Sequence, residues 1–416
     1  MSEKSNKKKI AVIGGGASGL FAAISAAAEA RRLCRDVDIT VFEANQRVGK
    51  KLLVSGNGRC NLSNINMSAD FYRGAPELFS AVYKKFDVHS VTQFFNTAGL
   101  LLRTDAAGRI YPVNNQASSV LDVLRREAER CGITENVGIK IERLEPVRGG
   151  LLLNSAVYAD ACIIACGGRA APVHGCDGGG YPLLSRWGVK ITPLYPALSP
   201  ICLCDFTKAL KGIRAESAIA IKRNGGVIAK SEGELQYTDY GVSGIPAMQI
   251  SRFAAAALNE NKADLFLFVD SAPFIEADAL REFFLSNRKR DPDKSCELLL
   301  SGIVPKRLAD VLLSKCSINP QKNIGGLHEA VFDKITAALK NAKYKISSVK
   351  GFADAQVTAG GVDAAEIDFE TLRLKKAKGI YICGEIADID GDCGGYNLQW
   401  AWSSGYTAGK SAVREL

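Results

Sequence analysis

The sequence predicts an α/β protein whose main domain is assembled from both ends of the chain and interrupted by an inserted module. Residues 10–30 read as an apolar strand, a glycine-rich turn and an alanine-rich helix. From Val189 the pattern changes, and alternating strands are followed by helical segments. After Phe352, short apolar strands that end in glycine return. We therefore expect the first and last parts of the chain to fold together.

The first strand and turn have the spacing of a dinucleotide-binding fingerprint. Residues 10–13 are apolar, and the G-x-G-x-x-G turn after them consists of Gly14, Gly15, Gly16, Ala17, Ser18 and Gly19. Gly14 allows the turn, Gly16 leaves the backbone open to a pyrophosphate, and Gly19 lets the helix pack close to the strand. The diphosphate is expected on free N–H groups at the positive end of the helix dipole.

A carboxylate completes this unit. Residues 38–43 look like the next parallel strand, which ends at Glu43, where the side chain can accept hydrogen bonds from an adenosine ribose. Because a carboxylate there repels a 2′-phosphate, we expect FAD or NAD rather than NADP. One alternative is a glycine-rich turn of another α/β protein. The uncharged stretch 10–28 is long enough for a membrane span, but four glycines and two serines interrupt it, so we interpret it as buried strand and helix.

Composition is that of an ordinary globular protein. The 416 residues suffice for two or three domains, with 47% hydrophobic and 23% charged residues. We attribute the mild net charge of +9 to an anionic cofactor and a solvated exterior rather than to a nucleic acid or membrane partner. The polar leader 1–9 precedes no signal-peptide core, so we expect a cytoplasmic protein. Twelve cysteines and three histidines without ligand spacing predict reduced thiols and no metal site.

A loop without helix or strand period follows Glu43. Its candidate cofactor-binding residues are Ala44, Arg47, Lys50, Lys51, Ser55, Gly56, Asn57, Gly58, Arg59, Cys60 and Asn61. Loops that leave the carboxyl ends of parallel strands line the ligand crevice. We interpret the basic side chains as neutralising the diphosphate and the backbone of 55–61 as touching the isoalloxazine edge. A solvated polar loop is the alternative.

The next part mixes helices and short strands. Residues 71–130 read as a mostly helical connection with a β excursion at 101–104 and 108–112, which carries Tyr111. Short strands are predicted at 138–142 and 150–153. A buried strand in 159–168 ends in Gly167 and its neighbour Gly168. The glycine cluster 175–181 lacks a βαβ unit, so we interpret it as a loop near the first site, before a helix at 182–187.

The inserted module begins with β structure and continues with helices. Residues 217–238 alternate as strands do, with a hairpin turn at Asn224-Gly225. A helix is expected within 241–251, and several more within 275–343.

The C-terminal part returns to a cofactor site. A strand at 379–383 runs into Gly384 and Glu385, where the carboxylate can hold ribityl hydroxyls. A small-residue helix at 398–412 is expected to face the pyrimidine end of a flavin. The further candidates here are Asp390, Gly391, Gly395, Tyr396, Asn397 and Leu398. The acidic residues of 385–392 lack the spacing of an EF-hand, which argues against a cation site.

Three blocks of this chain together resemble a known family. They are 14–20, the stretch from 48–52 through 55–61, and the stretch from 384 through 391–401. The chain resembles, from end to end, the BaiN/YhiN family of FAD-binding proteins, also labelled the aminoacetone oxidase family. The resemblance implies a discontinuous Rossmann-like FAD-binding domain of the two-dinucleotide-fold flavoprotein type at 1–190 and 355–416. It also implies an inserted β-barrel-like domain at 191–245 and 343–354 and a nested helical domain at 246–342.

The family includes a clostridial bile-acid reductase and an oxidase of aminoacetone, so the resemblance implies an FAD-dependent oxidoreductase. Our leading hypothesis is NAD(P)H-driven reduction of an activated C=C bond in a small bile-acid or enone substrate. Tyr396 is the first candidate for the proton donor, with Tyr111 and Tyr240 behind it. The chain shows no second nucleotide-binding fold, so a nicotinamide donor would dock transiently over the flavin.

Two other readings stay open. One is an FAD-dependent amine oxidase with O₂ as acceptor. The other is a tRNA-binding or non-catalytic flavoprotein, although the one dense basic run beyond the leader, 288–290, has no interleaved aromatic residues and reads as a solvated helix end. We therefore expect no nucleic-acid and no membrane partner, and the sequence leaves the oligomeric state open.

Overall fold

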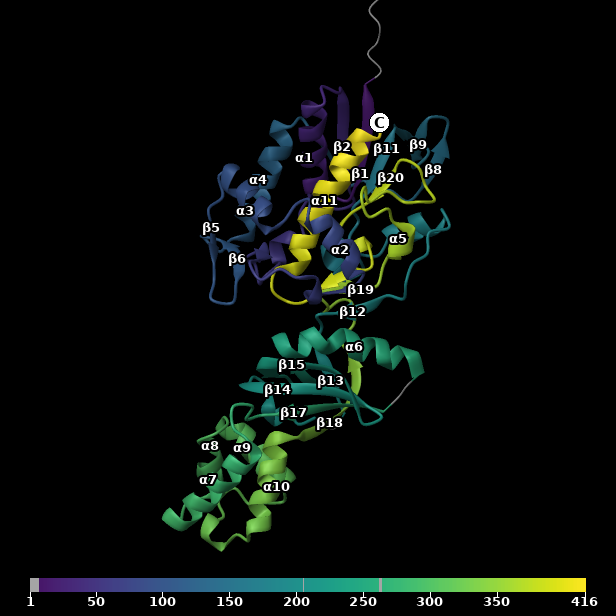
Figure 1. The fold of residues 1–416 in the computed structure, drawn as a ribbon. Coiled ribbons are helices and arrows are strands. Elements are labelled where there is room, and N and C mark those ends of the chain that lie inside the picture. Colours follow the sequence, from purple (N-terminus) through teal and green to yellow (C-terminus); the bar gives the residue numbers. More distant parts are fainter. Residues whose placement is uncertain (1–6, 205, 262–263) are drawn as a thin grey trace, which may run out of the picture. The chain divides into compact units, whose positions relative to one another are not determined.

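The computed structural model describes residues 7–204, 206–261 and 264–416, and they form two compact units. The first unit comprises Met1–Tyr195 and Gln356–Leu416, and the second comprises Pro196–Ala355 (Figure 1). The predicted α/β class with an inserted barrel and helical elements is confirmed. The exact domain limits given above stay predictions.

The first unit is built on a five-stranded parallel sheet. Its order is β20-β11-β1-β2-β7, with β1 at Lys8–Ile13, β2 at Val37–Glu43, β7 at Thr134–Val137, β11 at Ala161–Ile164 and β20 at Ile380–Ile382. Ile13 lies between Phe42 and Ile164 in the register. Because all five strands are parallel, their carboxyl ends meet at one edge of the sheet, where ligands bind in folds of this kind.

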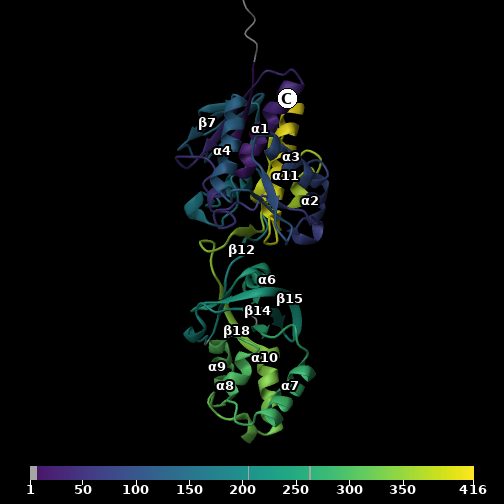
Figure 2. The same ribbon diagram turned by 90° about the vertical axis from the view of Figure 1, so that its left-hand side faces the viewer.

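Two long helices from opposite ends of the chain lie side by side on this sheet. They are α1 (Ala17–Arg32) and α11 (Tyr396–Arg414), adjacent in Figure 1 and Figure 2. A Cβ added at Gly405 would lie 2.6 Å from Ser18 O, and one at Gly409 would lie 2.2 Å from Ala22 O. The two glycines therefore let the helix backbones touch. This contact explains why the predicted C-terminal helix is rich in small residues.

Smaller elements surround the sheet and these helices. The helices are α2 (Pro76–Tyr83), α3 (Val88–Thr97), α4 (Ala117–Arg130) and α5 (Gly180–Ser185). The short strands are β3 (Ser63–Asn64), β4 (Tyr72–Gly74), β5 (Leu102–Thr104), β6 (Arg109–Pro112), β8 (Leu144–Val147), β9 (Gly150–Leu153), β10 (Val157–Ala159), β12 (Tyr195–Ala197), β19 (Val357–Ala359) and β21 (Ile389–Gly391). This confirms the mostly helical connection with its β excursion.

The second unit is a closed barrel with a helical lobe inserted between its strands β17 and β18. The barrel order is β13-β16-β15-β14-β17-β18, with bounds Ile201–Leu203, Gly241–Ser243, Gly226–Tyr237, Arg214–Arg223, Leu265–Asp270 and Ala342–Val349. The helices are α6 (Ile245–Asn261), α7 (Ala277–Arg290), α8 (Cys296–Ser301), α9 (Lys306–Lys315) and α10 (Glu329–Lys340). The hairpin turn is confirmed, because Asn224 and Gly225 have φ of +49° and +83° as a type I′ turn requires.

One predicted strand was wrong. Residues 138–142 form no strand, because Gly138 has φ +73° and its N–H donates to Asn45 O. The strand that pairs with β2 is instead Thr134–Val137. It lies at the sheet edge and has no fully buried residue, so its sequence carries no apolar signal.

The leader prediction also needs a correction. Residues 1–6 lie outside the described residues, but Lys8 and Lys9 already belong to β1. Lys8 Nζ donates to Asp160 Oδ1 over 2.8 Å, so a polar side chain begins the strand without being buried.

The remaining differences are shifts of limits. Helix α5 begins at Gly180, two residues before the predicted start, and Gly241–Ser243 forms a strand before α6 begins at Ile245. Strand β17 lies within 246–342, the stretch expected to be helical, because barrel closure pairs it with β14 and β18. Among the described residues, no helix is long and apolar enough to cross a membrane.

Candidate functional site

The carboxyl ends of β1, β2, β11 and β20 bring several predicted site residues together. The Gly14 N–H donates to Phe42 O over 2.8 Å, and a Cβ at Gly14 would lie 2.4 Å from Ala165 O. A Cβ at Gly384, after β20, would lie 2.3 Å from Ser18 Oγ. The glycine turn, the end of β11 and the end of β20 are therefore in direct contact.

The glycine turn has the geometry that its spacing predicts. Gly14 has φ +108°, and a Cβ at Gly19 would lie 1.9 Å from Gly14 O, so α1 packs tightly on the turn. A Cβ at Gly16 would meet nothing within 4 Å. No side chain caps α1, so its first N–H groups are left for an acceptor at this turn. An uncapped helix start at an open turn suits an anion, and the contact of this turn with the FAD diphosphate stays a prediction.

Glu43 is buried and held in place at the end of β2. Its exposed fraction is 9%, and Oε2 accepts a hydrogen bond from the Gly15 N–H over 2.9 Å. Its Oε1 accepts from the Asn45 N–H over 2.8 Å and also from the Asn45 side chain. The carboxylate is thus oriented at the strand end, where a ribose is expected. Oε2, with one donor, keeps a second lone pair for a hydroxyl.

The loop after β2 is folded by left-handed backbone angles. The residues with positive φ are Gly49, Gly56, Asn57, Gly58 and Cys60. The Gly49 N–H donates to Gly15 O over 2.8 Å, which fixes the loop to the glycine turn. Ser55 O accepts from the Cys60 N–H over 3.0 Å.

The structure gives the predicted residues of this loop different surroundings. Those with exposed side chains or backbone are Ala44, Arg47, Gly56, Asn57 and Arg59, while Lys50, Lys51, Ser55, Gly58 and Asn61 are half-buried and Cys60 is buried. Contacts with the diphosphate or the flavin stay predictions for all of them.

Lys51 and Glu385 form an ion pair between the loop after β2 and the turn after β20. Lys51 Nζ donates to Glu385 Oε2 over 2.7 Å, and Glu385 Oε1 accepts from the Thr358 N–H over 2.9 Å. Burial acts to lower the pKa of Lys51, but Glu385 and Cys176 outweigh it, so the net shift is upward. Lys51 was expected to neutralise the diphosphate and Glu385 to hold the ribityl chain. In this structure each of them contacts the other.

The N-terminus of α11 lies against the same loop. Gly395 has φ +101°, and a Cβ there would lie 2.3 Å from Ser63 O and 2.8 Å from Asn61 Oδ1. Asn61 Oδ1 is buried, and no described residue donates to it. No side chain caps α11, so its N–H groups are available to an acceptor. Together these groups fit the polar pyrimidine end of a flavin.

The turn before α11 is stiffened by its own residues. Asn397 Oδ1 accepts from the Gly391 N–H over 2.8 Å, and Asn397 Nδ2 donates to Gly391 O over 2.7 Å. Asp390 is 3% exposed, and Leu398 is half-buried. Asn397 and Gly391 thus shape the helix entry by bonding each other.

The two candidate catalytic tyrosines lie in different surroundings. Tyr396 stacks on Phe71 with 4.6 Å between ring centroids, and its hydroxyl donates to Asn66 O over 3.4 Å. Burial raises the pKa of Tyr396. Tyr111 is 3% exposed, and the Arg59 guanidinium lies 5.1 Å from its ring centroid. The third candidate, Tyr240, belongs to the second unit.

The cysteines near the strand ends are protonated thiols at neutral pH. Burial raises the pKa of Cys60 to about 12 and that of Cys176 to about 11. All twelve cysteines are free. Gly167 has φ +71°, and a Cβ there would lie 2.8 Å from Cys176 Sγ, so this thiol fills the space beside the turn after β11.

One residue beside this site was missed by sequence reasoning. Tyr181 is 6% exposed, and no described residue bonds its buried hydroxyl. Burial, and secondarily the Glu385 charge, raise the pKa of this phenol. The sequence feature that could have pointed to Tyr181 is the glycine cluster 175–181, which ends at this residue. A Cβ at Gly175 would lie 2.2 Å from Asn45 Nδ2, which agrees with the interpretation of this cluster as a loop near the first site.

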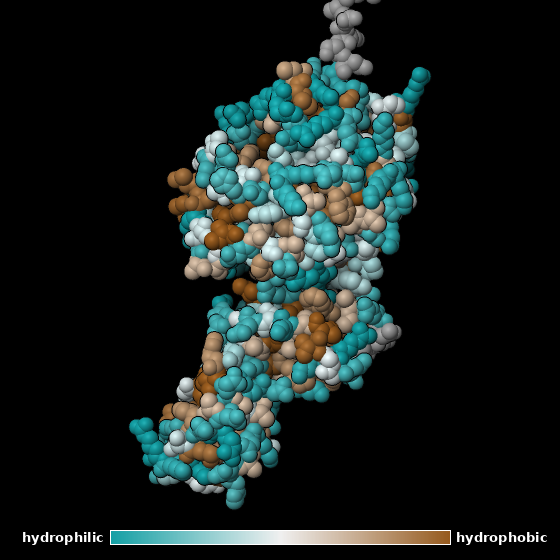
Figure 3. All heavy atoms as spheres, viewed as in Figure 1, coloured by the Kyte–Doolittle hydropathy of each residue, from teal (hydrophilic) through white to brown (hydrophobic). Residues whose placement is uncertain are grey.

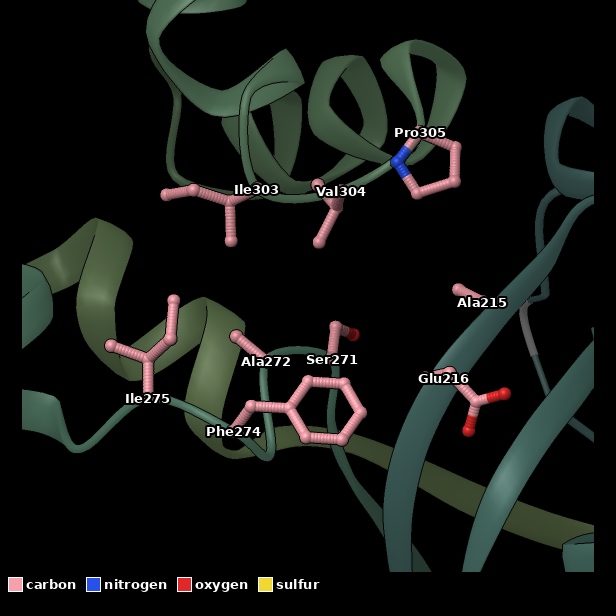
Figure 4. A pocket seen from close by; sticks show the side chains of 9 residues that line it. All are labelled: Ala215, Glu216, Ser271, Ala272, Phe274, Ile275, Ile303, Val304 and Pro305. Carbon is pink, nitrogen blue, oxygen red and sulfur yellow. The ribbon is translucent and has the colours of Figure 1, made fainter.

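Two hollows lie away from these strand ends. In the second unit, a pocket of about 160 Å³ lies between β14 and the helical lobe (Figure 4). Its lining residues are Ala215, Glu216, Ser271, Ala272, Phe274, Ile275, Ile303, Val304 and Pro305. In the first unit, a hollow of about 290 Å³ is lined by Ile65, Val88, His89, Thr92, Leu102, Thr104 and Ile110.

The glycine cradle, the carboxylate at the end of β2 and the two uncapped helix N-termini define a Rossmann-type FAD-binding flavoprotein. Residues 8–411 match the HI0933-like protein Rossmann domain. The chain belongs to this HI0933-like family, a family of flavoprotein oxidoreductases, which confirms the resemblance described above.

Relatives cover the chain almost completely. The 3-dehydro-bile acid delta(4,6)-reductase of Clostridium scindens is 39% identical over 411 residues, which cover 97% of this chain and 99% of that protein. The ribosomal RNA dihydrouridine synthase of Escherichia coli is 26% identical over 410 residues, with 97% of each chain covered. Among solved structures, the 3-ketosteroid delta1-dehydrogenase of Sterolibacterium denitrificans aligns with a TM-score of 0.49 and 13% identity, over 99% of this chain and 100% of that one.

Proposed function

We propose that this protein is an FAD-dependent reductase that uses NAD(P)H to reduce a C=C bond conjugated to a ketone, in a bile-acid or related enone. The observation that carries this proposal is the 39% identity to the 3-dehydro-bile acid delta(4,6)-reductase over 97% of the chain. The two hypotheses taken from sequence, FAD as cofactor and an activated C=C bond as acceptor, are both consistent with it.

The names of two relatives describe one kind of bond chemistry. A 3-dehydro bile acid with double bonds at positions 4 and 6 carries ring alkenes conjugated to a ketone. Dihydrouridine differs from uridine by saturation of a ring C=C bond next to a carbonyl. Reduction of a carbonyl-activated ring alkene is therefore common to relatives at 39% and 26% identity.

The residues at the strand ends suit the cofactor. When bound, FAD supplies the centre that accepts and donates hydride. The open N–H groups beside Gly16 would take its diphosphate, and Glu43 would take the adenosine ribose. The uncapped N-terminus of α11 would stabilise negative charge at the pyrimidine end by about 0.3–1 kcal/mol. These residues would thereby orient the cofactor between two helix N-termini.

Tyr396 is the proposed proton donor to the α-carbon of the substrate. Its phenol is neutral at physiological pH, because burial raises its pKa. The stack on Phe71 and the bond from the Tyr72 hydroxyl to Tyr396 O, at 2.7 Å, hold the residue in place. Tyr111 is the second candidate for this role.

A second candidate substrate is ribosomal RNA, because relatives named ribosomal RNA dihydrouridine synthase match over 97% of the chain. The dense basic run 288–290 gives this reading no support. It forms the last turn of α7, where Arg288 donates to Leu327 O and pairs with Glu329. The third hypothesis, an FAD-dependent amine oxidase, is tested by the same experiment.

The test is anaerobic reduction of the purified yellow holoprotein by NADH and then NADPH, followed by loss of flavin absorbance. The reduced protein is next mixed with a 3-oxo-4,6-diene steroid acid, with rRNA that lacks dihydrouridine, or with buffer. The proposal expects bleaching by a nicotinamide and reoxidation by the steroid. Reoxidation by RNA alone selects the second candidate. Bleaching by aminoacetone but by neither nicotinamide selects the oxidase.

A further inference from the structure

Two arginines converge on one buried tyrosine in the first unit. The Arg59 guanidinium carbon lies 5.1 Å from the Tyr111 ring centroid, and that of Arg103 lies 5.7 Å from it. Arg103 pairs with Tyr111 in the β5–β6 register, so the two side chains share one face of the hairpin. Arg59 comes from the loop after β2. The Tyr111 ring thus makes cation–π contacts with one arginine of the β5–β6 hairpin and one of the loop after β2.

Both guanidiniums are oriented by neutral acceptors and keep free donors. Arg103 Nη2 donates to Asn115 Oδ1 over 2.7 Å, and Arg59 Nε donates to Gly56 O over 3.3 Å. Both side chains are exposed, and no carboxylate of the described residues pairs with either. The nearby Asp105 is taken by Arg109 at 2.8 Å. Two exposed, pre-oriented arginines without a counter-charge suit an oxyanion.

Apolar side chains continue this face. The Val113 N–H donates to Leu101 O over 3.0 Å, so these two residues lie opposite each other two pairs beyond Arg103 and Tyr111, on the same face of the hairpin. Leu101 is 72% exposed and Val113 is 53% exposed. Figure 3 shows hydrophobic atoms gathered over the region of β5 and β6. The face therefore combines cations with an apolar surface.

This face also lies close to the candidate flavin site. Ser63 pairs with Ile110 of β6, and Leu62 N–H donates to Ile110 O over 2.8 Å. Ser63 O is in turn the atom closest to a Cβ added at Gly395, the N-cap of α11. One short strand, β3, thus separates the two arginines from the helix end assigned to the pyrimidine ring.

We infer that Arg59, Arg103 and Tyr111, together with Leu101 and Val113, form the recognition site for the carboxylate end of an amphipathic acid substrate. The arginines bind the carboxylate, and the apolar pair packs against the adjoining hydrocarbon. This inference rests on the proposed function, because it names how the same site selects a steroid acid. The inference assigns Arg59 to the substrate carboxylate, whereas the sequence analysis assigned it to the FAD diphosphate.

The test uses ligands that cannot be reduced, so it is independent of turnover. Cholate, its methyl ester and ADP-ribose are titrated calorimetrically into the holoprotein, and the flavin difference spectrum is recorded. The variants are Arg59→Gln, Arg103→Gln and Arg103→Lys. The matched control is Arg126→Gln, an exposed arginine of α4 whose one ion pair among the described residues is with Glu129. FAD content and thermal unfolding are measured for each variant.

We expect each Gln variant to weaken cholate binding about tenfold or more, from the loss of a charge-assisted hydrogen bond. Arg103→Lys should recover part of the affinity, and the methyl ester should bind wild type and variants alike. The inference is overturned if cholate does not bind, if its affinity stays within twofold in both Gln variants, or if the ester weakens equally. It is also overturned if only ADP-ribose binding falls, since the arginines would then serve a nucleotide phosphate.

Failure of the proposed function is a separate result. If no enone is reduced but cholate binding depends on the two arginines, the site stands and the reaction does not. If enones are reduced with equal KM for acid and ester in all variants, the reaction stands and the carboxylate site does not.

Discussion

Lys51 Nζ lies 2.7 Å from Glu385 Oε2, and this pair joins the loop after β2 to the turn after β20. The two residues are far apart in the sequence and belong to the two separate segments of the first unit. Glu385 is also anchored by the Thr358 N–H. The pair therefore fastens the C-terminal segment to the N-terminal segment at the edge of the sheet where FAD is expected.

Breaking this pair should destabilise the first unit. In Lys51→Met, Glu385 loses its cation and keeps, among the described residues, the hydrogen bond from the Thr358 N–H. We expect the free energy of unfolding to fall by about 2 kcal/mol, between the values for exposed and buried pairs. The double variant Lys51→Met/Glu385→Leu should recover part of this loss. Unfolding of the apoprotein by urea, followed by tryptophan fluorescence, measures both. Lys50→Met is the control, and equal stability of Lys50→Met and Lys51→Met would refute the prediction.

Two glycines of the turn should respond differently to alanine. A Cβ at Gly16 meets nothing within 4 Å, whereas one at Gly14 would meet Ala165 O at 2.4 Å on a backbone with φ +108°. Gly16→Ala should therefore melt like wild type as apoprotein, yet bind FAD about ten- to a hundredfold more weakly, from about 1–3 kcal/mol of crowding in the cradle. Gly14→Ala should lower the melting temperature itself. Quenching of flavin fluorescence measures the affinity for FAD. An unchanged affinity in Gly16→Ala would show that the diphosphate does not bind at this turn.

Tyr396→Phe should separate proton transfer from hydride transfer. The hydroxyl makes one long bond, 3.4 Å to Asn66 O, so its loss should cost little stability. If the phenol protonates the substrate, reoxidation by the enone should slow about 10²- to 10⁴-fold while reduction by NAD(P)H stays unchanged. Tyr72→Phe is the control, because its hydroxyl holds Tyr396 O and its removal should affect stability first. If Tyr396→Phe runs both half-reactions at the wild-type rates, Tyr396 is a structural residue and not the proton donor.

Local patterns predicted the parts of the site that local geometry determines. The spacing of Gly14, Gly16 and Gly19 predicted a turn, an open cradle and a tight helix contact, because each property depends on neighbouring atoms. The Asn224-Gly225 turn was predictable for the same reason. The polar edge strand β7 was missed, since its residues carry no apolar alternation and its place is set by pairing with β2.

Partners that are distant in the sequence were beyond local reasoning. Nothing near Lys51 indicates Glu385, and nothing near Arg59 indicates Tyr111, because both contacts depend on how loops cross the sheet edge. The same holds for Gly405 and Gly409, whose roles appear only when α11 lies against α1. Sequence reasoning thus identified the residues of the site more fully than their partners.

Acid should loosen the contact between α1 and α11 through one buried carboxylate. Glu29 of α1 is 2% exposed and accepts from Arg32 over 2.7 Å and from Arg414 of α11 over 2.6 Å. Arg32 above all, with help from Arg414 and Lys410 and against the cost of burial, lowers the pKa of Glu29 to about 2. A carboxyl whose pKa falls on folding stabilises the folded state above its unfolded pKa, near 4.5. It loses that contribution as the pH falls toward 2.

The contribution of Glu29 should therefore be about 3 kcal/mol at pH 7 and should decline steadily between pH 4.5 and 2. All three tryptophans lie in the first unit, so their fluorescence during urea unfolding reports on that unit alone. Glu29→Gln should be less stable than wild type at pH 7, and the two curves should converge at low pH. Glu129→Gln, an exposed carboxyl of α4, should track wild type throughout. If the difference in unfolding free energy between wild type and Glu29→Gln stays constant from pH 7 to 3, Glu29 stabilises the protein by packing and not by its ionised carboxylate.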